Sequence, residues 1–109
     1  MFYRKFSCEK ALLQAAISTA SRAVSPKSSI PALEGILLDA ADELRLTGYN
    51  LETGIRTVVP AEVQQPGSLV LSARLFGEIV RKLPDDVVDF SSDNYMVNIK
   101  CGMSYFKIL

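Results

Sequence analysis

Ser68–Leu83, with the sequence SLVLSARLFGEIVRKL, repeats an order of patterns that the chain has already gone through once. An apolar run typical of a strand leads at Ser72 directly into a helical pattern. The same transition occurs within Lys5–Val24, KFSCEKALLQAAISTASRAV. Three strand-like runs follow each helical pattern, so the chain contains two copies of a strand–helix–three-strand unit. A repeated supersecondary unit constrains a fold more than any single motif does.

The two helical patterns, Glu9–Val24 and Ala73–Leu83, are amphipathic. Their apolar residues recur at three- and four-residue steps, which places them on one face of a helix. Ser7 and Ser72 are the expected N-caps, because a serine hydroxyl can accept a hydrogen bond from a free N–H of the first turn. The expected apolar faces are Leu13, Ala16, Ile17, Ala20 and Val24 in the first helix, and Leu75, Phe76, Ile79, Val80 and Leu83 in the second.

The remaining patterns alternate between apolar and polar residues, as half-buried strands do. Short turn sequences separate the three strands that follow each helix, which favours antiparallel meanders. Two amphipathic helices would then cover one face of the sheets in an α+β fold. The expected strands are Lys5–Cys8, Leu33–Ala40, Glu43–Thr47, Gly54–Pro60, Ser68–Ser72, Val87–Ser91, Tyr95–Lys100 and Ser104–Leu109.

The composition is that of one small globular domain. The chain has 109 residues, 49% of them hydrophobic, and 12 Lys and Arg balance 12 Asp and Glu. Net charge therefore does not indicate a strongly basic nucleic-acid-binding protein, and any DNA contact would need local segregation of charge. Cys8 and Cys101 could pair, but two cysteines beside a normal core favour free thiols in the cytoplasm. No secretory signal or membrane span is recognisable. Because the chain ends at Leu109 inside an expected strand, we expect a fragment of a longer protein.

The sequence offers no catalytic constellation. It has no histidine, the commonest general base and metal ligand. It has no P-loop, no glycine-rich dinucleotide motif and no cysteine pair with zinc-site spacing. Glu9, Glu34, Asp39 and Asp42 are scattered carboxylates, and such surface acids are usually only solvated. We therefore expect a binding or structural protein with no catalytic residue, metal or cofactor.

The basic residues allow two interpretations. Arg74 and Arg81 lie two helical turns apart and share a face, while Lys10 and Arg22 lie on the polar face of the first helix and Lys27 follows in a loop. They can be solubilising charges on the exposed backs of two helices, which amphipathic helices always carry. They can also form a phosphate-facing surface built from both helices.

Several segments resemble the first domain of the bacterial sliding clamp, the beta subunit of DNA polymerase III. The resemblance covers almost the whole chain, and its most specific parts are the TGYNLE segment and the ARLF start of the second helix. The segments are Lys5–Ser7 before the first helix, Ser29–Leu38 (SIPALEGILL), Leu44–Glu52 (LRLTGYNLE), Pro66–Gly67, Ser72–Phe76 (SARLF) and Arg81–Pro84 (RKLP).

The resemblance implies the DNA-clamp fold, which is made of two strand–helix–three-strand units per domain. Three such domains form one subunit, and two subunits close head-to-tail into a ring around duplex DNA. The helices line the hole, and the sheets form the outer wall. Such a ring is not an enzyme. It tethers the polymerase to DNA and slides without sequence specificity. DNA polymerase and the clamp loader would bind through domains absent from this chain.

The resemblance also implies site residues. Lys27 falls where the family has a basic loop residue that touches DNA, and Arg74 and Arg81 fall on the pore-facing side of the second helix. Lys10, Gln14 and Arg22 on the first helix are further expected DNA contacts. Tyr105, Phe106, Lys107 and Ile108 match the edge strand that pairs with the partner subunit, and Leu75 is expected to border that interface.

Two alternatives to a clamp domain remain open from the residues alone. One is a stand-alone α+β interaction module that dimerises through an edge strand and has no DNA role. The other is an enzyme that uses Cys8 or a carboxylate. Basic residues on one concave face, with Asp42, Glu43, Asp85 and Asp86 elsewhere, would favour the clamp domain.

Overall fold

The computed structural model describes residues 4–24, 34–50, 52–94 and 96–109, and these form two helices and nine strands. The first half holds β1 (Arg4–Glu9), α1 (Lys10–Ser21), β2 (Gly35–Ala40), β3 (Leu44–Tyr49) and β4 (Gly54–Val59). A short strand, β5 (Glu62–Gln65), precedes the second half, which holds β6 (Gly67–Ser72), α2 (Ala73–Arg81), β7 (Val87–Ser92), β8 (Val97–Cys101) and β9 (Ser104–Ile108). The expected α+β class and the duplicated order of elements are confirmed.

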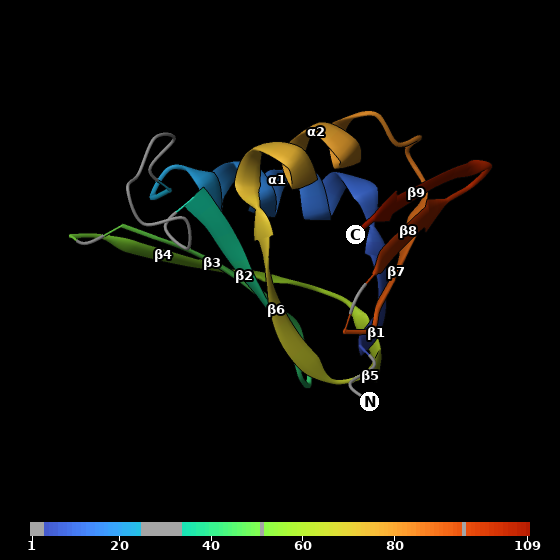
Figure 1. Cartoon of the computed structure of the whole chain (residues 1–109), viewed down its shortest axis with the longest axis horizontal. Coiled ribbons are helices and arrows are strands. Elements are labelled where there is room, and N and C mark those ends of the chain that lie inside the picture. The colour runs from blue at the N-terminus through green and yellow to red at the C-terminus, as the bar shows by residue number, and fades with distance from the viewer. Residues whose placement is uncertain (1–3, 25–33, 51, 95) are drawn as a thin grey trace.

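The strands form two antiparallel sheets that splay apart, and both helices lie across the open side between them (Figure 1). One sheet has the order β5-β1-β7-β8-β9 and the other β4-β3-β2-β6. The first strand of each half therefore pairs with the meander of the other half. The registers correspond: Glu9, directly before α1, pairs with Val87 at the start of β7, and Ser72, directly before α2, pairs with Gly35 at the start of β2. The two halves are interlocked copies of one topology.

Three local expectations from the sequence are wrong. Strand β5 was not expected, because its sequence EVQQ places only Val63 against the core. Ser7 does not cap α1, since β1 continues through Glu9 and the Ser7 hydroxyl donates to Asp89 on the neighbouring strand (2.8 Å). Leu75 does not belong to the core, because 37% of it is exposed. Ser72 does cap α2, as its hydroxyl accepts from the backbone N–H of Leu75 at 3.2 Å.

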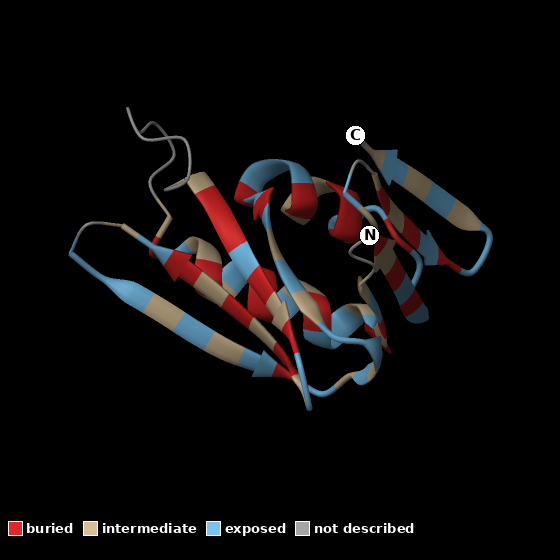
Figure 2. Cartoon of the chain, turned by 60° about the horizontal axis from the view of Figure 1, so that its bottom comes forward, coloured by how far each residue is buried: buried red, intermediate tan, exposed pale blue. Residues whose placement is uncertain are grey.

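The hydrophobic core fills the wedge between the two sheets and the helices above them, as the alternating buried residues of the strands show (Figure 2). Three phenylalanines connect the layers. The Phe6 and Phe90 rings, on β1 and β7, stack with centroids 4.6 Å apart, and Phe76 of α2 meets Phe90 edge-on at 6.1 Å. The rest of each helix's apolar face is buried as expected, except that Val24 is only partly buried. This packing holds α1 and α2 in fixed positions on the sheets.

Two residues of the TGYNLE segment have structural roles. Gly48 on β3 lies directly beneath the end of α1, where a Cβ atom would come within 1.9 Å of the Ala20 carbonyl oxygen. Asn50 shapes the turn after β3, since its side-chain oxygen accepts from the backbone N–H groups of Glu52 (2.8 Å) and Thr53 (2.7 Å). The segment thus sets how closely α1 approaches the sheet and how β3 turns into β4.

Candidate nucleic-acid interface

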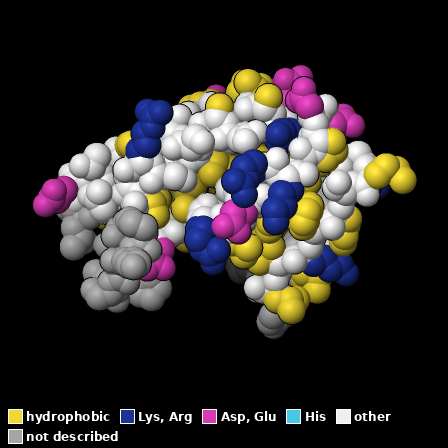
Figure 3. All heavy atoms as spheres, turned by 90° about the horizontal axis from the view of Figure 1, so that it is seen from above, with side chains coloured by type: hydrophobic (Ala, Val, Ile, Leu, Met, Phe, Trp, Pro, Cys, Tyr) yellow, Lys and Arg dark blue, Asp and Glu magenta, His cyan; other side chains and the backbone are white. Residues whose placement is uncertain are grey.

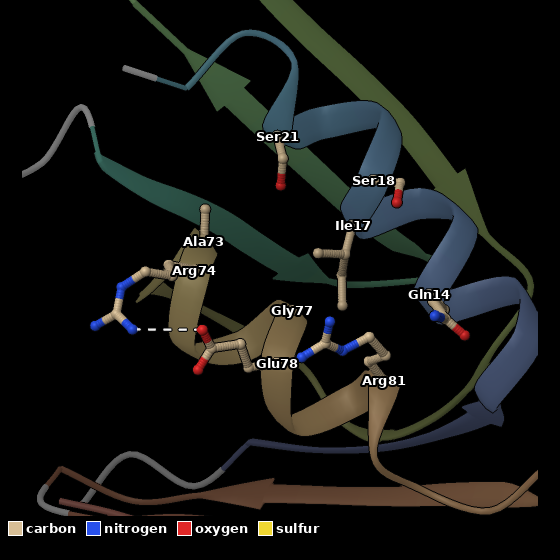
Figure 4. A pocket seen from close by; sticks show the side chains of 9 residues that line it. All are labelled: Gln14, Ile17, Ser18, Ser21, Ala73, Arg74, Gly77, Glu78 and Arg81. Atoms are coloured by element: carbon tan, nitrogen blue, oxygen red, sulfur yellow. Dashed lines mark ion pairs between the residues drawn. The ribbon is translucent and has the colours of Figure 1, made fainter. Parts of the chain in front are cut away.

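The two helices leave a groove between them, with a volume of about 370 Å³ (Figure 4). Buried Ile17 and Ala73 form part of its floor, and more exposed side chains of both helices form its walls. Ala73 and Gly77 of α2 bring little or no side chain to it, so the helices approach closely there. It is lined by Gln14, Ile17, Ser18 and Ser21 of α1 and by Ala73, Arg74, Gly77, Glu78 and Arg81 of α2.

The groove brings together Gln14, Arg74 and Arg81, which were expected to contact DNA. The spacing of the two arginines along α2 was the signal that placed them on one face. Ser18 and Ser21, whose hydroxyls also line the groove, were not predicted as site residues. Their spacing from Gln14, four and seven residues along one helix face, is the signal that could have identified them.

Three charged side chains, those of Arg74, Glu78 and Arg81, form a stripe along α2. Glu78 lies one turn after Arg74, and its Oε1 atom is 3.5 Å from the Arg74 Nη1 atom. Arg81 follows on the next turn, and in the view of Figure 4 its side chain lies across the middle of the groove, between Gln14 and Glu78. Both partners of the ion pair are accessible, with 79% of the Arg74 side chain and 45% of the Glu78 side chain exposed. The stripe therefore offers two guanidinium groups to an anion, with a carboxylate between them.

The other expected DNA contacts lie outside this groove. Lys10 is the first residue of α1 and is half-buried, whereas Arg22 follows the last turn of α1 and is exposed. The length of α1 separates them by roughly 18 Å, at about 1.5 Å per residue. Lys27 lies outside the residues that the structure describes.

Acidic and basic residues are only partly segregated. Seen from the helix side, Lys and Arg side chains gather over the middle of the molecule, with an acidic side chain among them and others at the rim (Figure 3). Asp42 and Glu43 belong to the β2–β3 connection, away from the helices, and Glu43 pairs with Arg45 at 3.3 Å. Asp85 and Asp86, however, border the start of α1, where the backbone N–H of Lys10 donates to the Asp86 carbonyl (3.0 Å). Among the described residues, basic side chains thus occupy the groove and the far end of α1, whereas acidic residues border the start of α1.

Strand β9 is the edge of its sheet. It pairs with β8 from Val97↔Ile108 to Cys101↔Ser104, and no described strand lies on its other side. Phe106 and Ile108 are half-buried against the core, while Tyr105 and Lys107 point outward and are exposed. The Tyr105 hydroxyl donates to the Asn98 side-chain oxygen at 2.7 Å. The outer row of backbone groups of β9 is therefore available to another strand.

The two thiols are free and buried, in positions unsuited to catalysis. Cys8 on β1 and Cys101 on β8 both lie opposite Val88 on the intervening strand β7. Two strand spacings put their Cα atoms roughly 9–10 Å apart, too far for a disulfide. Burial, aided by the Asp89 carboxylate, raises the pKa of Cys8 from 9.0 to about 12, and burial also raises the pKa of Cys101. A catalytic thiol needs a lowered pKa, so the burial and the raised pKa of Cys8 argue against an enzyme that uses this thiol.

The described ranges contain neither a metal-binding cluster nor a membrane-spanning helix. Residues 4–24, 34–50, 52–94 and 96–109 contain no group of three or more His, Cys, Asp or Glu placed to hold a metal ion. Neither helix in this part of the chain is long and apolar enough to span a membrane.

Comparison with known proteins identifies the family. Residues 4–109 match the model of the DNA polymerase III beta subunit, N-terminal domain. The chain belongs to this family. Among its relatives, the beta sliding clamp of Micrococcus luteus is 34% identical over 105 residues, and that of Bacillus subtilis is 35% identical over 114 residues. Each alignment covers 95% of this chain, but only 34% and 30% of the relative.

Solved structures of the beta subunit family share the fold. A DNA polymerase III beta subunit from Eubacterium rectale superposes with a TM-score of 0.94 at 36% identity, covering 97% of this chain and 29% of that one. The sliding clamp of Bacillus subtilis gives a TM-score of 0.91 at 34% identity, covering 96% and 30%. The chain thus spans about a third of the length of these relatives and corresponds to their N-terminal domain.

Proposed function

We propose that this chain is the amino-terminal domain of a bacterial sliding clamp, a ring-shaped processivity factor for DNA polymerase. In this proposal a complete subunit contains three domains of this kind, and two subunits close head-to-tail around duplex DNA. The protein is not an enzyme and acts in the cytoplasm, where the closed ring tethers the polymerase. DNA polymerase and the clamp loader bind to domains outside this chain.

The groove between α1 and α2 carries the proposal. Its donors, the guanidinium groups of Arg74 and Arg81, the Gln14 amide and two serine hydroxyls, suit phosphate oxygens. The neutral chain supplies too little charge for tight binding, and weak contacts to the backbone permit sliding. In the assembled ring, Lys10 and Arg22 add contacts at the two ends of α1, and Lys27 is a further proposed DNA contact.

Strand β9 provides the proposed contact between subunits. Its free backbone groups continue the sheet into the partner subunit by main-chain hydrogen bonds. Phe106 and Ile108, already half-buried against the core, become more buried there, and Leu75 on α2 contributes exposed apolar surface.

An NMR titration of the isotope-labelled chain with a short DNA duplex tests the DNA contact. We expect signals of groove residues to shift at about 50 mM salt and to shift much less at about 200 mM salt. Replacing Arg74 and Arg81 together with Ala should remove the shifts. Replacing Lys5 and Lys100 together with Ala removes the same charge from two exposed positions outside the groove; this matched control should leave the shifts unchanged.

The outcome separates a clamp domain from other DNA-binding proteins. Two duplexes of unrelated sequence should bind equally, because the proposed contacts are to phosphates. Sequence-dependent binding, or shifts confined to the outer faces of the sheets, would refute this use of the helices. In the complete subunit, retention on circular DNA that is lost when the DNA is cut would demonstrate the topological link.

A further inference from the structure

Glu78 is the one acidic side chain that lines the groove among the described residues. It lies between Arg74 and Arg81 on the exposed stripe of α2, and its carboxylate is 3.5 Å from the Arg74 guanidinium (Figure 4). A carboxylate at this place reduces the positive charge of the stripe from two to one. If the stripe serves DNA, as proposed above, Glu78 works against binding.

The stability of the fold does not require an acidic residue at position 78. Its ion pair with Arg74 is largely exposed, and exposed pairs one helical turn apart contribute little to stability. Glutamine has nearly the same shape and helix propensity. Glu78 is half-exposed and is not among the residues that cap α2. Its effect is therefore expected on the charge of the groove more than on folding.

We infer that Glu78 competes with DNA phosphate for the Arg74 guanidinium and thereby keeps the affinity of the groove for duplex DNA low. A carboxylate and a phosphate accept the same hydrogen bonds from a guanidinium group. A phosphate that reaches Arg74 either displaces the Glu78 carboxylate or binds at the free N–H groups of the guanidinium, where it lies beside a second anion. The inference rests on the proposed function, and it adds a residue that tunes the strength of the contact toward sliding.

Glu78→Gln tests the inference in the same NMR titration. We expect duplex DNA to bind roughly three- to tenfold more tightly, because the Arg74 guanidinium then meets the phosphates without a competing carboxylate beside it. The salt dependence should also become steeper by about one unit in log K against log[salt]. The ratio of variant to wild-type affinity should thus be about four times larger at about 50 mM than at about 200 mM salt.

The matched control is Glu52→Gln. Glu52 is an exposed residue in the turn between β3 and β4 and does not line the groove. Its substitution removes the same charge from the chain, so it measures the effect of net charge alone. Glu78→Gln combined with Arg74→Gln, compared with Arg74→Gln alone, asks whether Arg74 transmits the effect. The gain in affinity should largely disappear when Arg74 is absent.

Each outcome bears on a different statement. If the wild type binds DNA and Glu78→Gln gains no more than Glu52→Gln, the inference is wrong and the proposed function stands. If the gain persists without Arg74, competition for Arg74 is refuted. If the wild type shows no groove shifts but Glu78→Gln does, the inference is supported. If neither protein shows groove shifts at low salt, both the inference and the DNA-contact role of the groove fail.

Discussion

Replacing Gly48 with Ala should be the most damaging small substitution on β3. The added Cβ would lie 1.9 Å from the Ala20 carbonyl oxygen and 2.8 Å from its carbonyl carbon. An ordinary carbon–oxygen contact is about 3.3–3.6 Å, so α1 and β3 would have to separate by more than about 1 Å. The obstacle is helix backbone, which cannot rotate away as a side chain can. The end of α1 must therefore lift from the sheet.

The magnitude follows from the packing that this movement disturbs. Overpacking a well-filled core typically costs about 1–3 kcal/mol and occasionally more. Ala20 and Leu46, the latter two residues before Gly48, are fully buried, so a separation would loosen tightly packed surface. We expect Gly48→Ala to lower the free energy of unfolding by about 3 kcal/mol or more. For a domain near this size, this corresponds to a fall in Tm of more than about 10 °C.

The matched control is Gly77→Ala in α2. A Cβ at Gly77 would meet only the Ile17 Cγ2 atom, at an ordinary 3.6 Å. Because Ala is favoured over Gly inside a helix by about 0.8–1.0 kcal/mol, Gly77→Ala should leave stability unchanged or raise it. Denaturant unfolding followed by circular dichroism, with equal m-values, measures both changes. A Gly48→Ala midpoint within about 0.5 kcal/mol of the wild type would refute the close-approach argument.

Three further predictions concern the core, a thiol and the edge strand. Ile17→Ala should lower the unfolding free energy by about 2–5 kcal/mol, and a change below about 0.5 kcal/mol in denaturant unfolding would mean that this face is not buried. The pKa of Cys8 rises on folding from 9.0 to about 12, so the free energy of unfolding should be constant with respect to this thiol below pH 9 and should fall as the pH rises from 9 to about 12. Unfolding curves at increasing pH should show a smaller fall for Cys8→Ala than for the wild type. The free edge of β9 should cause weak self-association in sedimentation, which Ile108→Lys should reduce; monomers at millimolar concentration for both proteins would contradict this.

The sequence predicted the elements better than their pairing. Burial of one helix face and alternation along strands are local patterns, so Ile17, Phe76 and Leu46 could be assigned to the core from spacing alone. The exchange of β1 and β6 between the halves has no local pattern, because either arrangement buries the same side chains. Strand β5 escaped prediction for the related reason that its pairing with β1 does not require an apolar sequence.

The candidate site was predictable where helical spacing determined it. Arg74 and Arg81 share a face in any helix, but only the packing of α1 against α2 adds Gln14 and Ser18 to the same groove. The TGYNLE segment, which is among the clearest parts of the family resemblance, has a structural role and is not part of the groove. Gly48 and Asn50 are explained by helix packing and by a turn, so this segment identifies the fold and not the binding surface.

The duplication explains why the charge of the groove can vary independently of the fold. Each helix starts directly after its strand, so positions can be matched by counting from Lys10 and Ala73. The fourth and eighth residues are buried apolar residues in both helices: Leu13 and Ile17 in α1, Phe76 and Val80 in α2.

The exposed positions do not correspond in this way. The second, sixth and ninth residues are Ala11, Ala15 and Ser18 in α1, but Arg74, Glu78 and Arg81 in α2. Packing against the sheets restricts the first set and leaves the second set free. The charged stripe of α2, including the acid within it, is therefore not required by the architecture that the two halves share. It follows that Arg74, Glu78 and Arg81 can be altered to test the proposed DNA contact while the core remains intact.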